Sequence, residues 1–353
     1  MAAPKQAELL VFIRINKWKG RLFIGKLLLF LFLSGCFFSK SAILAQTNAI
    51  IATSNYKTKK LTLLQPAPKP NKTRLWFVAG GSTATYTASM VMLNKTWYSQ
   101  YPRTQFHWFK DWDGWMQIDK AGHAWTAYFE AEYLTNLYQW AGLSLPKAAL
   151  LGGGTALVYQ NGIELLDGTS VGWGASPGDI AANALGAAAH TIQALTWRQQ
   201  RIRIKFFSHK LNYGHYGPAV QARALSLYGQ SLPERVLKDY NGQTYWVSAN
   251  LKSFAPRAKW LPKWLNLAAG YGVEGLLGAQ KNSWETPQGQ TINAPHIVRV
   301  RQFYLSPDID LSRIKTRWRG VNIALNMLNI IKIPAPAISL NSKGKWQFYG
   351  LYW

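Results

Sequence analysis

The chain has 353 residues, of which 48% are hydrophobic, so it can bury a sizeable core in one large domain or two ordinary ones. Only 16% of the residues are charged, yet the formal net charge is +25. This bias indicates an anionic partner, either membrane lipid or an anionic envelope polymer. We find no zinc-finger, RNP or helix-turn-helix signature and therefore expect no nucleic-acid partner.

Residues 1–45 have the pattern of an export signal. A basic stretch precedes the apolar run from Leu27 to Phe38, and a cleavage region follows that ends at Ala45. The sequence Leu-Ser-Gly-Cys36 also fits a lipobox, in which Cys36, the only cysteine, would be lipidated. Both interpretations predict export to the periplasm or the outer membrane. A third is an uncleaved anchor, for which the apolar run is short.

Residues 46–74 are polar and contain several prolines, which is typical of a linker. The uncharged run from Leu75 to Leu93 predicts a helix, buried in a bundle or close to a membrane. Residues 97–115 are rich in aromatic side chains. That pattern fits a membrane interface or a loop packed over the end of a bundle.

Three further helices are predicted over residues 116–140, 147–166 and 179–199. Ser176 is the expected N-cap of the last helix. Ala182 and Gly186 lie four residues apart, a spacing that favours close helix packing. The basic residues between Arg198 and Lys210 are interpreted as a solvated helix end, with a site for anionic headgroups as the alternative.

From about residue 240 the sequence becomes rich in β-branched and aromatic residues. Strands are predicted over 244–250, 265–276, 296–305, 335–340 and 345–353, with a hairpin turn at 341–344 and one helix over 321–331. The predicted fold class is therefore α+β, a helical bundle of about four apolar helices followed by a small antiparallel β-sheet. The expected regions are a signal (1–45), a linker (46–74), a helical domain (75–210) and a β-rich region with one helix (211–353).

Three polar motifs interrupt the apolar, small-residue-rich helices, at residues 119–123, 164–168 and 176–186. Within each motif the polar residues are three or four positions apart and share a helix face. Ionisable groups are costly inside apolar helices unless they are paired, so we expect one shared polar centre. Its members are Asp119, Lys120, His123, Glu164, Asp167, Asp179 and Asn183.

Three interpretations of this centre stay open. It is a hydrogen-bonded network that fixes helix register, or a binding or catalytic site, or a metal site. In a catalytic site His123 would act as acid or base, with Asp119, Glu164 or Asp179 as its orienting partner. The same residue types suit Zn²⁺ or Mn²⁺, but no HExxH-type motif is present, so we expect no cofactor or metal, with a divalent metal as the alternative.

Over roughly residues 98–207 the motif text resembles the YfiM-like family of predicted periplasmic lipoproteins, a domain of unknown function. There is also a looser likeness to VanZ-like domains, which are inner-membrane helical proteins tied to glycopeptide tolerance. That likeness maps onto Asp119, Lys120, His123, Glu164, Asp179, Asn183 and Gly186. The first resemblance implies an envelope location and no known activity.

We therefore expect an exported, membrane-associated envelope protein that binds lipid or cell-wall material through the helical domain, with a mainly structural polar centre. One alternative is an enzyme that acts on a lipid-linked or cell-wall substrate, with His123 as acid or base. Another is an inner-membrane VanZ-like protein, which would require that the N-terminal segment stay uncleaved. The sequence names no protein partner.

Overall fold

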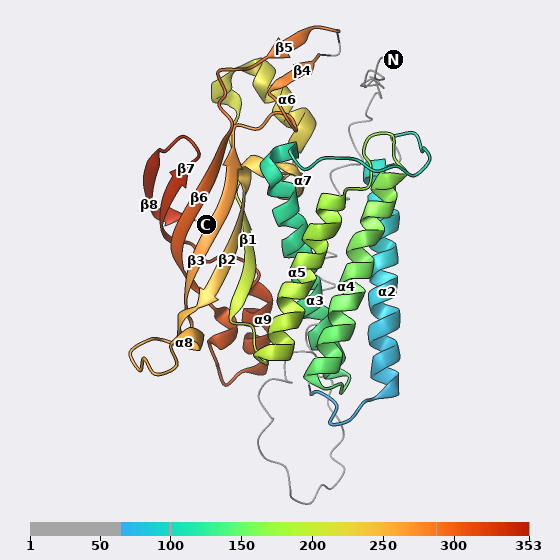
Figure 1. Ribbon diagram of the computed structural model, residues 1–353, viewed down its shortest axis with the longest axis vertical. Helices are drawn as coiled ribbons and strands as arrows, with labels where there is room; N and C mark the ends of the chain where they lie inside the picture. The colour runs from blue at the N-terminus through green and yellow to red at the C-terminus, as the bar shows by residue number, and fades with distance from the viewer. Residues whose placement is uncertain (1–64, 99–100, 287, 353) are drawn as a thin grey trace, which may run out of the picture.

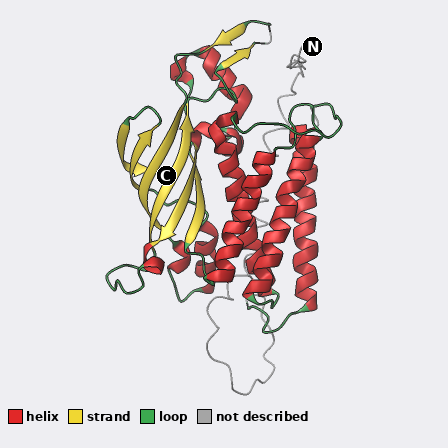
Figure 2. Ribbon diagram, viewed as in Figure 1, coloured by secondary structure: helices red, strands yellow, loops and turns green. Residues whose placement is uncertain are grey.

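The computed structural model describes residues 65–98, 101–286 and 288–352. They form a helical bundle with an antiparallel sheet beside it (Figure 1, Figure 2). The bundle consists of α2 (Lys72–Leu93), α3 (Ile118–Trp140), α4 (Leu145–Gly168) and α5 (Pro177–Thr196). The predicted α+β class, a bundle followed by a sheet, is confirmed. The predicted export signal and Cys36 lie outside the described residues.

Helix α3 packs against both α4 and α5, because small residues let the backbones approach closely. A Cβ atom added at Gly186 of α5 would overlap the Ala124 carbonyl group of α3. One added at Gly152 of α4 would lie 2.6 Å from the backbone nitrogen of Thr135. This close packing brings together the helix faces that carry the polar motifs.

The chain enters α3 through a strained turn. Trp115, Met116 and Gln117 have φ angles of 50°, 53° and 62°, a left-handed region that such residues rarely adopt. The sheet holds the turn, since the Tyr271 hydroxyl donates to the Met116 carbonyl oxygen. In addition, Arg301 Nη2 donates to Gln117 Oε1 at 2.7 Å. The start of α3 is therefore fixed by contacts from the sheet.

The sheet has six strands in the order β1-β2-β3-β6-β7-β8, and each neighbouring pair is antiparallel. Its strands are β1 (Ile202–Ser208), β2 (Gln243–Asn250), β3 (Leu265–Glu274), β6 (Val300–Ile309), β7 (Ala335–Asn341) and β8 (Trp346–Tyr352). The five predicted strands correspond to all of these except β1. The predicted turn at 341–344 joins β7 to β8.

Shorter elements lie at the two ends of the sheet (Figure 1). At one end are α6 (Pro218–Tyr228), α7 (Leu232–Lys238) and a hairpin of β4 (Ser283–Glu285) and β5 (Thr291–Asn293). At the other are α8 (Leu251–Phe254) and α9 (Arg319–Leu328), the latter being the helix predicted over 321–331.

The sheet curls strongly. Three strands separate β2 from β8, so in a flat sheet the two would be about 19 Å apart. Instead, Thr244 Oγ1 of β2 lies 3.3 Å from the hydroxyl oxygen of Tyr352 in β8. The segment before β7 extends the curl, because Ile331 forms a parallel bridge with Phe206 of β1. The sheet thus has a concave and a convex face.

The concave face is buried, and charged and polar side chains lie on it beside the rings of Trp246 and Tyr304. Lys205 Nζ lies 2.8 Å from Asp308 Oδ2, and both side chains are fully buried. Ser248 donates to the same carboxylate at 2.6 Å. Lys332 donates to the Ser306 hydroxyl at 3.2 Å, and burial lowers the pKa of Lys332 to about 8. The interior of the curl is therefore held by ion pairs and hydrogen bonds.

The interpretation of the basic cluster as a solvated helix end was wrong for Arg203 and Lys205. Both lie in β1 and are buried with acidic partners. Arg203 Nη1 lies 2.6 Å from Glu132 Oε1 of α3, and Lys205 pairs with Asp308. The prediction failed because these partners are far away in the sequence.

The convex face is apolar. Trp125 of α3 packs on Phe206 and Tyr245 and covers one part of this face. The uncovered part, here called the convex apolar face, exposes the side chains of Val247, Leu267, Phe303, Leu305, Ile338, Trp346 and Phe348. An antiparallel sheet with one solvated face normally has the opposite pattern, with polar residues outside.

The bundle combines the polar motifs at one end with a buried apolar core that includes Val78, Leu134 and Leu137, and it also exposes apolar groups. Exposed apolar side chains lie along α2, α4 and α5: Trp76, Phe77, Leu150, Val158, Leu165, Leu185 and Ile192. Within the part of the chain that the structure describes, none of the helices combines the length and the hydropathy needed to cross a membrane.

The close approach at Gly186 gives a first prediction. The change Gly186→Ala should lower the free energy of unfolding by about 1–3 kcal/mol, because the added methyl group meets the Ala124 carbonyl group. The matched control is Gly154→Ala in α4, where no atom lies within 4 Å of the new Cβ. This control should keep or slightly raise stability, since alanine favours a helix by about 1 kcal/mol. Chemical unfolding followed by circular dichroism would measure both, and equal stabilities would contradict the packing.

Candidate functional site

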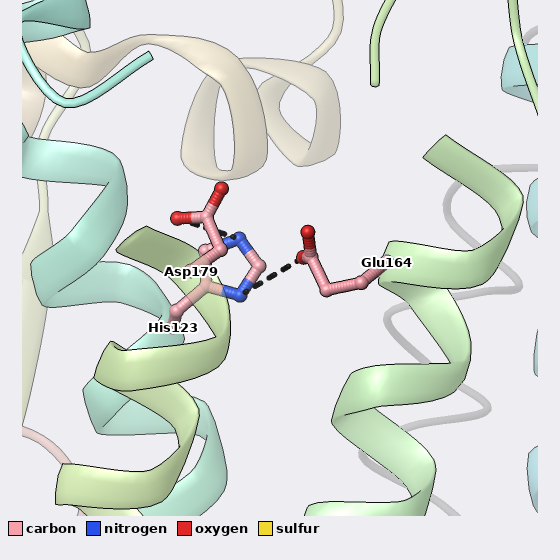
Figure 3. Close-up of side chains that lie close together, drawn as sticks. All are labelled: His123, Glu164 and Asp179. Carbon is pink, nitrogen blue, oxygen red and sulfur yellow. Dashed lines mark ion pairs between the residues drawn. The ribbon is translucent and has the colours of Figure 1, made fainter. Parts of the chain in front are cut away.

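The three polar motifs meet where α3 begins, α4 ends and α5 begins. Figure 3 shows His123 of α3 between Glu164 of α4 and Asp179 of α5. The other predicted members lie around these three: Asp119, Lys120, Asp167 and Asn183. The residues expected to share one polar centre are thus brought together.

Lys120 is the cation of the centre. Its Nζ lies 2.7 Å from Asp111 Oδ2, 2.9 Å from Asp179 Oδ1 and 3.0 Å from Asp119 Oδ2. Burial alone would lower the pKa of Lys120, but these three carboxylates raise it above the usual value. For Asp111, burial opposes ionisation, yet hydrogen bonds from Lys120 and Ser176 hold its pKa below the usual value.

His123 is held from three sides. Its Nε2 lies 3.6 Å from Asp179 Oδ1, and its Nδ1 lies 3.9 Å from Glu164 Oε1. The same Nδ1 lies 3.1 Å from Asn183 Oδ1. Asn183 uses its amide nitrogen to donate to Asn161 Oδ1 at 3.2 Å, so its oxygen is the acceptor that faces the ring. In the neutral imidazole this places the proton on Nδ1 and leaves the lone pair on Nε2.

Ser176 connects α4 to α5. Its backbone nitrogen donates to Glu164 Oε2 at 3.0 Å. Its hydroxyl oxygen accepts from the Asp179 nitrogen at 3.1 Å, as expected for the predicted N-cap, and the hydroxyl donates to Asp111 Oδ1 at 2.5 Å. Among the described residues, none donates a hydrogen bond to Glu164 Oε1, and the Glu164 side chain is only 3% exposed. Burial raises the pKa of Glu164 to about 7.

Asp167 lies at the edge of the centre. Its Oδ1 accepts a hydrogen bond of 2.7 Å from the Tyr98 hydroxyl. Burial raises the pKa of Asp167 to about 6, although the bond from Tyr98 opposes the shift. Tyr98 belongs to the aromatic-rich segment of residues 97–115, here called the connector. At this point the connector packs on the end of the bundle.

The centre contains more carboxyl groups than cations. The carboxyl groups are Asp111, Asp119, Glu164, Asp167 and Asp179, and the nearby basic side chains are Lys120 and His123. Two buried carboxylate oxygens of the centre receive no hydrogen bond from the described residues: Asp119 Oδ1 and Glu164 Oε1. Burial raises the pKa of Asp119 as well. Such an arrangement can retain protons or take up a cation.

Sequence reasoning did not identify Asp111, Asn161 or Tyr98 as members of the centre. The sequence spacing could have identified Asn161, because it precedes Glu164 by three positions and so shares its helix face. Asp111 and Tyr98 lie in the connector before α3, where no periodicity predicts which way a side chain points.

Comparison with known families gives one match to report. A family model described as a predicted periplasmic lipoprotein (DUF2279) matches residues 107–194, less than half of the chain. The matched part contains all three polar motifs and supports the expectation of an exported, periplasmic envelope protein of uncharacterised function. No curated protein and no solved structure matches the chain.

The raised pKa of Asp167 predicts how stability depends on pH. A buried carboxyl with a raised folded-state pKa costs no stability below its unfolded pKa, and the cost develops as pH rises from about 4 to about 6. The variant Asp167→Asn should therefore gain on the order of 1–2 kcal/mol over the wild type across this range. Asp111→Asn should show the opposite sign, because the pKa of Asp111 is lowered. Denaturant unfolding at a series of pH values would measure both, and parallel pH profiles would contradict the assignment.

Proposed function

We propose that this protein is an envelope protein that contacts membrane lipid through its apolar exterior. The observation that carries the proposal is the reversed polarity of the sheet. Its concave face buries the Lys205–Asp308 ion pair, while its convex apolar face exposes aliphatic and aromatic side chains, with Phe303 at 49% and Phe348 at 69%. Contiguous exposed apolar surface of this kind is rare on monomeric soluble proteins and marks a binding surface.

Two further features favour lipid over another protein as the occupant. The formal net charge of +25 attracts anionic headgroups, at about 1 kcal/mol for each basic residue near the surface. Exposed tryptophans occur in the loops at the ends of the two layers, a residue type enriched where membrane meets water: Trp108, Trp112, Trp260 and Trp318. The occupant we propose is therefore the acyl region of an anionic membrane.

The lipid contact predicts the behaviour of a triple variant. Val247→Thr, Leu267→Thr and Phe303→Thr together keep β-forming residues but remove much of the convex apolar face. Co-flotation with vesicles of phosphatidylcholine and phosphatidylglycerol should fall about tenfold or more, since each lost apolar side chain removes about 1.5–3 kcal/mol of burial. Circular dichroism would show whether the sheet is kept.

The control is the double variant Leu232→Gln and Leu237→Gln in α7, which removes exposed apolar side chains away from the sheet. It should bind vesicles as the wild type does. Unchanged flotation of the folded triple variant would contradict lipid contact through this face. Flotation that persists only without phosphatidylglycerol would contradict the role of charge.

A second candidate is an enzyme that acts on a lipid-linked or cell-wall substrate, with His123 as acid or base. It is favoured by the access to this ring, since 23% of the His123 side chain is exposed while Glu164 and Asp179 are at 3% and 9%. Asp179 would orient the ring or stabilise its charged form. The inner-membrane, VanZ-like alternative stays a prediction.

The change His123→Ala separates catalysis from architecture. If the ring is catalytic, the variant should fail to restore the envelope phenotype of a deletion strain, while its thermal midpoint stays within a few degrees of the wild-type value. Complementation and thermal unfolding of the purified protein are the two measurements. A parallel loss of both stability and complementation would count against the enzyme.

A further inference from the structure

On the Glu164 side, the space between His123, Glu164 and Asp179 has no lysine or arginine among the described residues. Within the described residues, Lys120 reaches Asp179 but forms no ion pair with Glu164, and Glu164 has no lysine or arginine partner. Glu164 Oε1 is buried and receives no hydrogen bond from the described residues, whereas Asp179 Oδ1 lies 2.9 Å from Lys120 Nζ. Both oxygens belong to side chains that are at least nine-tenths buried and point at the His123 ring (Figure 3).

The hydrogen bond that His123 Nδ1 donates to Asn183 Oδ1 bears on the same space. With the proton of the neutral ring on Nδ1, the Nε2 lone pair of His123 faces Asp179 Oδ1 at 3.6 Å. Two electron-rich atoms that face each other in a buried site repel unless a proton or a cation lies between them. The orientation of Asn183 is itself fixed by Asn161. Such a hydrogen bond to the second ring nitrogen is what orients a metal-binding histidine.

We propose that this centre binds one divalent transition-metal ion, of the Zn²⁺ or Mn²⁺ type. Its ligands would be one ring nitrogen of His123 and one carboxylate oxygen each from Glu164 and Asp179. These three ligand atoms lie within 4.8 Å of one another. Metal–ligand bonds of about 2.1 Å place the ligand atoms of a tetrahedral ion about 3.4 Å apart, close to the 3.6 Å between His123 Nε2 and Asp179 Oδ1. Glu164 Oε1 lies 3.9 Å from the other ring nitrogen, Nδ1, so its side chain would shift toward Nε2 when the ion binds. This inference does not rest on the lipid contact.

The types of ligand and the helices that hold them both fit an ion such as Zn²⁺ or Mn²⁺. One imidazole and two carboxylates suit Zn²⁺ or Mn²⁺ better than Ca²⁺ or Mg²⁺, which prefer oxygen ligands alone. Each ligand comes from a different helix of the tightly packed bundle, so the set is held by rigid elements. In the neighbouring group of Asp111, Asp119 and Asp179, the ammonium of Lys120 contacts all three carboxylates, so that group carries no such inference. In the proposed set the same ammonium contacts Asp179 alone.

The test is metal content measured on the full chain in mild detergent. The protein is stripped with chelator, incubated with ZnCl₂ or MnCl₂ alone, desalted, and measured by native mass spectrometry. We expect one bound ion per chain, with a higher thermal midpoint when metal is present. The variants Glu164→Gln and His123→Gln should each lose the ion and the thermal shift. Glutamine at 164 can still accept the hydrogen bond from Ser176, so the helix connection is kept.

The matched control is Glu130→Gln, a half-buried carboxyl of α3 outside the proposed ligand set. It should retain the ion and the shift. A folded wild-type chain that holds neither Zn²⁺ nor Mn²⁺ after desalting would overturn the inference. Metal retained undiminished by both ligand variants would also overturn it, because the ion would be bound elsewhere. A ligand variant that fails to fold is replaced by Asp179→Asn, judged by the same two measurements.

Discussion

The ammonium group of Lys120 forms the ion pairs on which the arrangement of the bundle depends. It joins the loop before α3, α3 itself and the first turn of α5, through Asp111, Asp119 and Asp179. Removing one partner of a buried ion pair costs about 3–5 kcal/mol, because the other charges stay behind. The contact sets where α5 begins and thereby its register on α3. That register places Asn183 beside His123 and Gly186 against the backbone of α3.

Helix α3 contacts both layers of the molecule, the helical bundle and the sheet. Its first turns carry the polar centre, and further along Trp125 packs on the convex side of the sheet. The sheet in turn holds the left-handed entry to α3 through Tyr271 and Arg301. Both layers bury paired charges beside apolar or aromatic side chains, and both expose aliphatic side chains. Paired charges tolerate a dry interior, and an apolar exterior is favourable where the surroundings are lipid.

Sequence patterns predicted the features that depend on residues close together in the chain. Spacing of three and four placed the polar side chains on inward helix faces, and β-branched, aromatic runs located five of the six strands of the sheet. The sequence did not reveal β1, because its alternation of basic and apolar residues looked like the end of a helix. Its lysine and arginine are buried by Asp308 and Glu132, which lie far away in the chain. Asp111 was also missed, because it lies in a loop. The sequence of a loop has no periodicity that predicts the direction of its side chains.

The parallel bridge between Phe206 and Ile331 has a consequence for the order of folding. The edge of β1 is made before its partner segment, which precedes the last two strands. A chain that is synthesised or translocated from its N-terminus must therefore keep this strand edge unpaired until the segment around Ile331 follows. Such edges recruit other strands, and contacts between distant segments form slowly. Loss of the last two dozen residues would leave the curl unfinished on its far side, with the Lys205–Asp308 pair facing solvent and the edge of β6 open to neighbouring chains.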